Sequence, residues 1–189
     1  MKTLSYHILD IVQNSLNAGA DLVEISIEQN VQEGLFTIII KDNGKGMDRQ
    51  TLQKAIDPYF STRNERNVGL GLSLLKQNTE RTGGYCIIDS TPGHGTLVKA
   101  EFVKHHIDCP ALGDLAGTIH QIIVSNTGKD FVYRHHKEDL GFKIDSREIK
   151  EVLDHLPLYY PEISKYIGEM IRENLNELRE EADTLNSSC

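Results

Sequence analysis

Cysteine is scarce in this chain: there are three among 189 residues, far apart at positions 86, 109 and 189. This odd, scattered set predicts neither a disulfide framework nor a paired zinc motif. Long apolar runs are lacking too, because no stretch approaches the ~18 uninterrupted apolar residues of a membrane span. The first residues carry Asp10 within an apolar segment, unlike a secretory signal. We therefore expect a soluble, cytoplasmic protein without membrane association.

Cationic residues are in the minority, with 20 Lys and Arg against 28 Asp and Glu and a net charge of −8. They are scattered rather than gathered in the stripe that binding to a phosphate backbone requires, which argues against nucleic acid as the main partner. The length allows one domain with an appendage. Because the character of the sequence changes near residue 104, we predict domains at 1–104 and 105–189.

Hydrophobic periodicity predicts the order of the helices and strands. The first half is expected to contain helices at 5–18, 48–56 and 70–83, with strand pairs at 22–29/35–42 and 85–90/95–103. The second half is expected to contain a buried helix at 111–124, a hairpin at 131–145 and an amphipathic helix at 161–181.

Polar residues on the first helix recur every three or four positions and so share one face. They are His7, Asp10, Asn14, Asn17 and Asp21. A solvated helix surface has the same pattern, so the stripe alone does not distinguish a site from an ordinary exposed face.

Glycine clusters occur at three other points of the chain. In DNGKGM, Asp42 ends a strand and two glycines follow, which allows close approach of the backbone to a ligand. Gly69 and Gly71 stand at a helix start, where free N–H groups and the helix dipole favour phosphate. The segment 93–96 has the pattern of a hairpin turn. Each cluster, taken singly, is equally compatible with a tight turn.

Together, in this order, the clusters resemble the four sequence boxes of the GHKL superfamily. That superfamily holds gyrase-type topoisomerases, large heat-shock chaperones, histidine kinases and mismatch-repair ATPases. The resemblance covers residues 5–103. DIVQNSLNAGAD is most similar to the mismatch-repair helix, whereas DPYFSTR and GLGLSLLK are similar to the histidine-kinase version.

The resemblance implies a Bergerat-type α/β two-layer sandwich, a mainly antiparallel sheet with helices on one face, plus a small C-terminal α+β extension. It also implies that ATP and Mg²⁺ bind between the helices and the sheet. Asn14 would supply a magnesium oxygen ligand, and Asp42 would accept the adenine amino group. A carboxylate only accepts hydrogen bonds, so it suits an exocyclic amine and rejects a guanine carbonyl.

Further residues are implied as part of the nucleotide site by the same resemblance. Gly44 and Gly46 would let the chain pass under the base, the backbone around positions 69–72 would hold the phosphates, and Thr96 would support Asp42. The whole cofactor-binding set is Asn14, Asn17, Asp42, Gly44, Gly46, Met47, Phe60, Thr62, Arg63, Gly69, Leu70, Gly71, Leu72 and Thr96.

Asp10 lies one helical turn before Asn14, where hydrolysing members of the superfamily carry a carboxylate, usually Glu. A carboxylate there can orient and deprotonate an attacking water. The shorter Asp implies slow hydrolysis or transfer to a protein hydroxyl, and the alternative is a carboxylate that merely solvates the helix. His7 could orient Asp10 or be an ordinary surface histidine.

The segment 61–68 is expected to form a short lid, in which Arg63 and Arg66 contact the terminal phosphate or simply solvate the surface. The first helix begins too early to leave room upstream for the phospho-accepting hairpin of a sensor kinase. The paired histidines at 105–106 and 135–136, with Cys109, could be metal ligands, a phospho-acceptor or ordinary residues.

The leading functional hypothesis is an ATP-dependent regulatory protein, a kinase or slow ATPase whose target is another protein reached through the C-terminal extension or the lid. The rival hypothesis is a non-catalytic, ATP-sensing switch. A DNA-processing ATPase is a third reading, against which the charge of −8 argues. The oligomeric state stays open, a homo-oligomer included.

Overall fold

The computed structural model describes residues 3–57, 70–154 and 156–186. Its helices are α1 (Leu4–Asn17), α2 (Arg49–Ile56), α3 (Leu70–Arg81), α4 (Leu115–Ser125), α5 (Ser146–Val152) and α6 (Pro161–Asn186). Its strands are β1 (Leu22–Asn30), β2 (Leu35–Asp42), β3 (Tyr85–Thr91), β4 (Gly95–Val103), β5 (Asp130–Lys137) and β6 (Leu140–Asp145). The predicted elements are all present, with ends shifted by a few residues.

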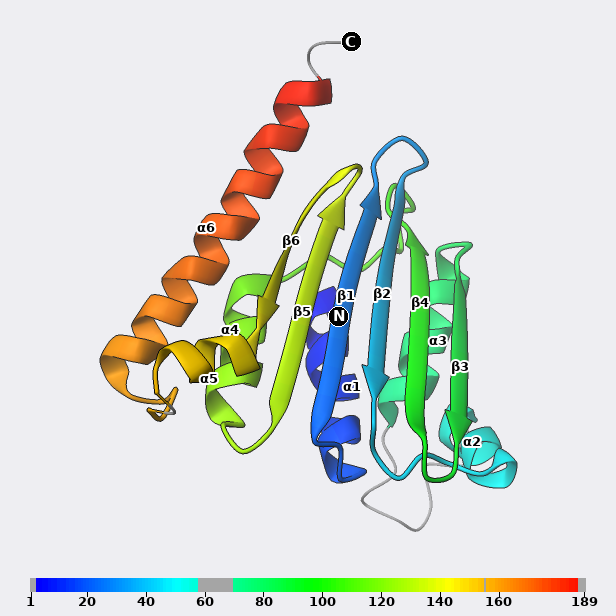
Figure 1. Ribbon diagram of the computed structural model, residues 1–189. Coiled ribbons are helices and arrows are strands. Elements are labelled where there is room, and N and C mark those ends of the chain that lie inside the picture. The colour runs from blue at the N-terminus through cyan, green and yellow to red at the C-terminus, as the bar shows by residue number, and fades with distance from the viewer. Residues whose placement is uncertain (1–2, 58–69, 155, 187–189) are drawn as a thin grey trace.

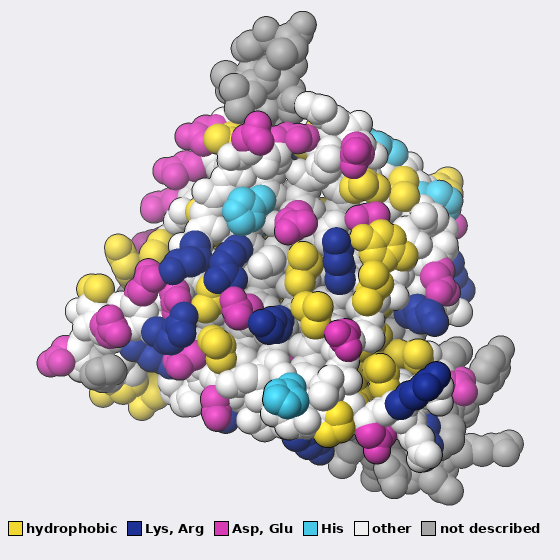
Figure 2. All heavy atoms as spheres, turned by 45° about the vertical axis from the view of Figure 1, so that its right-hand side comes forward, with side chains coloured by type: hydrophobic (Ala, Val, Ile, Leu, Met, Phe, Trp, Pro, Cys, Tyr) yellow, Lys and Arg dark blue, Asp and Glu magenta, His cyan; other side chains and the backbone are white. Residues whose placement is uncertain are grey.

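The six strands form one sheet in the order β3-β4-β2-β1-β5-β6. All neighbouring strands are antiparallel except β1 and β5, which are parallel. Helices α1, α3 and α4 cover one face of this sheet (Figure 1). The opposite face carries acidic, basic and hydrophobic side chains side by side (Figure 2). The predicted two-layer fold, mainly antiparallel with helices on one face, is confirmed.

Helix α1 begins and ends at residues suited to those positions. The Thr3 hydroxyl accepts a hydrogen bond from Tyr6 N at 3.2 Å and caps the first turn. Ile8, Ile11 and Val12 bury the apolar face against the sheet. Gly19, with φ +78°, takes the left-handed conformation that ends the helix. These features fix the position of the polar side of α1 relative to the sheet.

Strand β2 brings Asp42 to the edge of the helix-covered face. Alternating residues such as Ile38 and Ile40 are buried, as expected for a strand with one face on the core. At the end of the strand, Asp42 pairs with Val23 of β1 and Thr96 of β4. A carboxylate in this position, 7% exposed, lies beneath the end of α1.

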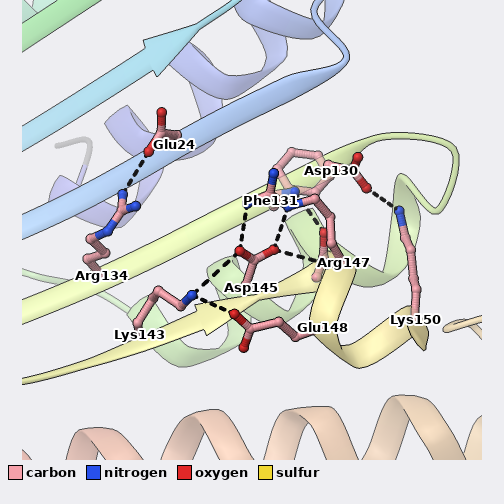
Figure 3. A network of polar contacts seen from close by, with 10 residues as sticks. Glu24, Asp130, Phe131, Arg134, Lys143, Asp145, Arg147, Glu148 and Lys150 are labelled. Carbon is pink, nitrogen blue, oxygen red and sulfur yellow. Dashed lines mark hydrogen bonds and ion pairs between the residues drawn. The ribbon is translucent and has the colours of Figure 1, made fainter. Parts of the chain in front are cut away.

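The C-terminal residues complete the same sheet rather than forming a separate one. Strand β5 pairs with β1 from Leu22↔Asp130 to Gln29↔Lys137, and β6 closes a hairpin with β5. The predicted division after residue 104 therefore has strands of one sheet on both sides of it. Ion pairs hold α5 to the hairpin: Lys150 Nζ lies 2.8 Å from Asp130 Oδ1, and Arg147 Nη2 lies 2.7 Å from Asp145 Oδ2 (Figure 3).

The segment between β4 and α4 is packed against the start of α1. Leu4 N and Ser5 N donate to the carbonyls of Ala111 and Leu112, each at 2.9 Å. These bonds satisfy N–H groups in the first turn that have no partner within the helix. Helix α4 follows this segment and packs between α1 and α6. None of the helices in the described part of the chain is long and apolar enough to cross a membrane.

Candidate functional site

A cavity lies between the helix layer and the sheet, below the C-terminal half of α1. Polar side chains on its wall include Asn14, Ser15, Asn17, Asp42 and Thr96. The remaining lining residues are Ile11, Ala18, Lys45, Gly46, Met47, Thr51, Ala55, Leu72 and Val98. An apolar wall with a few converging polar groups is the usual make-up of a small-molecule site.

Asp42 is the buried carboxylate of this cavity, and three hydrogen bonds fix its orientation. Its Oδ1 accepts from the backbone N–H groups of Gly44 at 2.9 Å and Thr96 at 3.2 Å. Its Oδ2 accepts from the Ser15 hydroxyl at 2.7 Å. Since a carboxylate has about four lone-pair positions, one on Oδ2 is left to accept from a ligand. The support that Thr96 gives to Asp42 comes from its backbone.

Asp10 and Asn14 of α1 face the start of α3. A Cβ atom placed on Gly71 would lie 2.9 Å from the Asp10 carboxyl carbon and 3.5 Å from Asn14 Nδ2. Any larger residue at position 71 would therefore displace the carboxylate. The first turn of α3, with its outward N–H groups, lies beside a carboxylate and an amide.

Gly44 and Gly46 are required by contacts within the protein itself. A Cβ on Gly44 would lie 3.0 Å from the Ala18 carbonyl oxygen at the end of α1. Gly46 has φ +63°, and a Cβ there would overlap the Thr91 carbonyl. The glycines thus let the loop after β2 lie flat between α1 and the β3–β4 turn, beside Asp42.

Ser90 ties this loop to the β3–β4 hairpin. Its hydroxyl accepts from Met47 N at 2.8 Å and lies 2.9 Å from the Thr96 hydroxyl. Met47 and Thr96, both expected in the site, are thereby linked through the Ser90 side chain.

The structure thus brings together most of the expected residues that it describes. Asn14, Asn17, Asp42, Gly46, Met47, Leu72 and Thr96 line the cavity, while Asp10, Gly44 and Gly71 adjoin it. Leu70 is the first residue of α3. The expected residues Phe60, Thr62, Arg63 and Gly69, and the lid as a whole, lie outside the described residues.

Two members of the polar stripe on α1 differ from the expectation. The reading of His7 as a surface residue is wrong: it is 1% exposed, and its Nε2 lies 2.9 Å from Asn78 Nδ2 of α3. Asp21 lies beyond the helix, directly before β1, and accepts from Lys129 Nζ at 2.7 Å, so it forms an ion pair with the loop before β5. The polar stripe therefore has three parts. His7 is buried at one end, Asp10, Asn14 and Asn17 lie at the cavity, and Asp21 forms a surface ion pair at the other end.

The histidine pairs do not gather into a metal centre in the described part of the chain, where no group of three His, Cys, Asp or Glu side chains could hold an ion. His105 and His106 are exposed. His135 is 2% exposed, with its Nε2 2.7 Å from Gln29 Nε2 and its Nδ1 2.8 Å from the Tyr133 hydroxyl. Burial lowers the pKa of His135 to about 4, so the ring is neutral at pH 7.

Sequence reasoning missed Ser15, Ser90 and Lys45. Ser15 follows Asn14 directly, but neighbours on a helix point about 100° apart, so its reach to Asp42 depends on how α1 sits over β2. Ser90 looks like an ordinary strand residue until β3 and β4 are paired. The local signal that could have pointed to Ser15 is that it is a small polar residue directly after Asn14.

A family model described as histidine kinase-, DNA gyrase B- and HSP90-like ATPase matches residues 2–106. The chain belongs to this family, and that region is its ATP-binding domain. The match contains every element that lines the cavity, from α1 to β4.

Curated relatives include sensor histidine kinases. The chain is 32% identical to sensor histidine kinase YxdK of Bacillus subtilis (strain 168) over 108 residues, which are 54% of this chain and 33% of YxdK. It is 33% identical to sensor histidine kinase ZraS of Klebsiella oxytoca over 91 residues, 48% of this chain and 20% of ZraS. The chain thus spans a third or less of the length of these relatives.

Among solved structures, the fold is similar to the MutL ATPase domain of Aquifex aeolicus complexed with ADP. The TM-score is 0.50 at 15% identity, over 82% of this chain and 70% of that one. The N-terminal domain of a DNA repair protein gives a TM-score of 0.52 at 17% identity, over 77% and 52%. Both likenesses extend beyond residue 106, and at such low identity they concern the fold alone.

Proposed function

We propose that this chain is a regulatory protein that binds Mg-ATP and acts, as a protein kinase or slow ATPase, on a partner protein. The observation that carries the proposal is the pairing of two polar centres across the end of α1. Asp42, with one open lone pair, lies at one of them, and Asp10 and Asn14 face the start of α3 at the other.

In this proposal, Asp42 recognises the adenine base by a hydrogen bond. Its Oδ1 is filled by two backbone donors, so Oδ2 is the atom that accepts the exocyclic amine. Met47, Ala55 and Val98 supply apolar contacts for the base within the same cavity. The polarity matters because a guanine would place a carbonyl oxygen against the carboxylate.

The residues present also fit Mg²⁺. The ion prefers oxygen ligands and keeps several waters, so the side-chain oxygen of Asn14 and the phosphate oxygens are a sufficient set. When bound, Mg²⁺ neutralises charge that develops on the phosphates. The N–H groups at the start of α3 favour the same anionic groups.

Asp10 is the proposed general base. Its carboxyl carbon would lie 2.9 Å from a Cβ placed on Gly71, so the carboxylate borders the proposed phosphate position. There it can orient a water or a partner hydroxyl and accept its proton. The C-terminal residues, which contact α1 through Ala111 and Leu112, are the proposed docking part for the partner.

Asp10→Asn tests this function, because the amide keeps the shape of the side chain but cannot accept a proton. We expect Mg-ATP affinity to stay within a few-fold while turnover falls by roughly 10²–10⁴. Calorimetric titration measures the affinity, and release of labelled phosphate, with and without cell extract, measures turnover. Asp139→Asn, on the exposed β5–β6 turn, is the charge-matched control.

The same pair of measurements separates the rival function. Equal turnover in the wild type and the variant would show that Asp10 is only a helix-surface carboxylate. Tight ATP binding without turnover in either protein would favour the non-catalytic switch. A DNA-processing ATPase has no support beyond the fold, and the charge of −8 opposes it.

A further inference from the structure

A second cavity, of about 450 Å³, lies apart from the nucleotide site, between the ends of β1 and β5, the start of α4 and the second half of α6. Figure 1 shows α6 running alongside the sheet edge, with α4 behind the strands. The sheet contributes Gln29, His135 and Lys137, and α6 contributes side chains from Arg172 to Arg179. None of its lining residues lines the nucleotide cavity.

The charge of this cavity is opposite to that of the whole chain. Lys137, Arg172 and Arg179 line it, against the single carboxylate of Asp114. That carboxylate is engaged, since its Oδ1 accepts from Gly117 N at 2.8 Å and caps α4. In a chain with a net charge of −8, such a local excess of cations is unexpected.

Both arginines line the cavity from α6. Arg172 and Arg179 are seven residues apart, which is about two turns of helix, so they project from the same side of α6. Among the residues that the structure describes, neither guanidinium has an ion-pair partner. A guanidinium binds carboxylate or phosphate through two parallel N–H groups, and both arginines are free to do so.

Four apolar side chains also line the cavity. They are Leu112, Leu115, and Leu175 and Leu178 of α6. The buried His135 and the half-buried Gln29, which also line the cavity, are hydrogen-bonded to each other at 2.7 Å. The lining therefore suits a hydrocarbon body that carries an anionic end.

We propose that this cavity is a binding site for a small organic anion, in which Arg172 and Arg179 hold a carboxylate or phosphate head and the leucines cover an aliphatic chain. The site is independent of the nucleotide and of the proposed reaction. The guanidinium groups give the specificity for the anionic head, and the leucines contribute affinity in proportion to the apolar area that they cover.

Calorimetric titration of octanoate and of octyl phosphate into the full chain, with saturating Mg-ATP present, tests the proposal. We expect saturable binding of at least one probe with a stoichiometry of one. Octanol, which has the same chain without charge, should bind at least ~10-fold more weakly, since charge-assisted hydrogen bonds to the head are lost. The tighter of the two anions identifies the head group.

The double variant Arg172→Gln/Arg179→Gln should bind the tighter of the two anionic probes at least ~10-fold more weakly. Lys165→Gln, on an exposed turn of the same helix, should leave that binding unchanged. Thermal unfolding without ligand checks that each variant is folded, and Arg172→Lys is the milder variant if the double change is not. Absence of saturable binding, equal binding of octanol, or equal weakening by Lys165→Gln would overturn the proposal.

Discussion

Replacing Asp42 by Asn changes one atom at the centre of the nucleotide cavity. The amide oxygen can take the place of Oδ1, because the donors there are backbone N–H groups, at 2.9 Å from Gly44 and 3.2 Å from Thr96. The amide NH₂ then takes the place of Oδ2, 2.7 Å from the Ser15 hydroxyl. That hydroxyl can rotate from donor to acceptor, so every internal hydrogen bond survives. We therefore expect the variant to fold.

The ligand meets a different surface in this variant. The open lone pair on Oδ2 is replaced by an N–H, which opposes the amino group of adenine, donor against donor. Losing a charge-assisted bond and mispairing the site costs on the order of 2–4 kcal/mol, or ~30-fold to ~1,000-fold in affinity. Mg-GTP, whose base has a carbonyl at that place, should lose less affinity than Mg-ATP. The ratio of the ATP affinity to the GTP affinity should therefore fall.

Calorimetric titration of both nucleotides, with Asp139→Asn as the charge-matched control, measures these changes. Thermal unfolding without nucleotide should give nearly the same midpoint for both variants. Unchanged ATP affinity in a folded Asp42→Asn protein would remove Asp42 from the site. Ser15→Ala keeps the carboxylate and loses one of its three donors, so it should weaken ATP less than Asp42→Asn; a larger effect would refute the lone-pair argument.

Three further variants test the site and its supports. Asn14→Ala should abolish the magnesium dependence of ATP binding, measured with and without chelator, because the proposed metal ligand is lost. Burial lowers the pKa of His135 to about 4. Since the unfolded ring titrates near ~6.5, folding stability should fall by about 3 kcal/mol as pH drops from ~6.5 to ~4, and urea titrations of His135→Gln across that range should lack this slope. Hydrogen bonds from Arg147 hold the pKa of Asp145 below its usual value. Asp145→Asn should therefore lower the unfolding free energy at neutral pH by about 1–3 kcal/mol, and the difference from the wild type should vanish once pH falls below the folded pKa of Asp145.

The helices and strands could be predicted because their signals are local. In β1, branched residues such as Val23, Ile25 and Ile27 alternate with polar ones, and one buried face follows directly from that alternation. Asp48 marked the start of α2 and does cap it, through Thr51 N at 2.7 Å. The expected nucleotide residues came from the order of the motifs along the chain.

Contacts between distant segments could not be predicted in this way. The parallel pairing of β1 with β5 joins residues about a hundred positions apart, and neither strand carries a mark of its partner. His7 is polar and lies on a polar stripe, yet α3 packs over it. The bond from Ser15 to Asp42 depends on the height of α1 over the sheet. Each of these is a consequence of packing rather than of local sequence.

The position of β1 within the sheet also constrains how the chain can fold as it is synthesised. β1 is central, yet its second neighbour, β5, begins only at Asp130. Until that segment leaves the ribosome, β1 is an edge strand with unpaired N–H and C=O groups, which can pair with other chains. At roughly 5–20 residues per second, the hundred residues between them take several seconds or more to emerge. Nascent chains of this protein should therefore depend on chaperones during that interval more than the finished protein does.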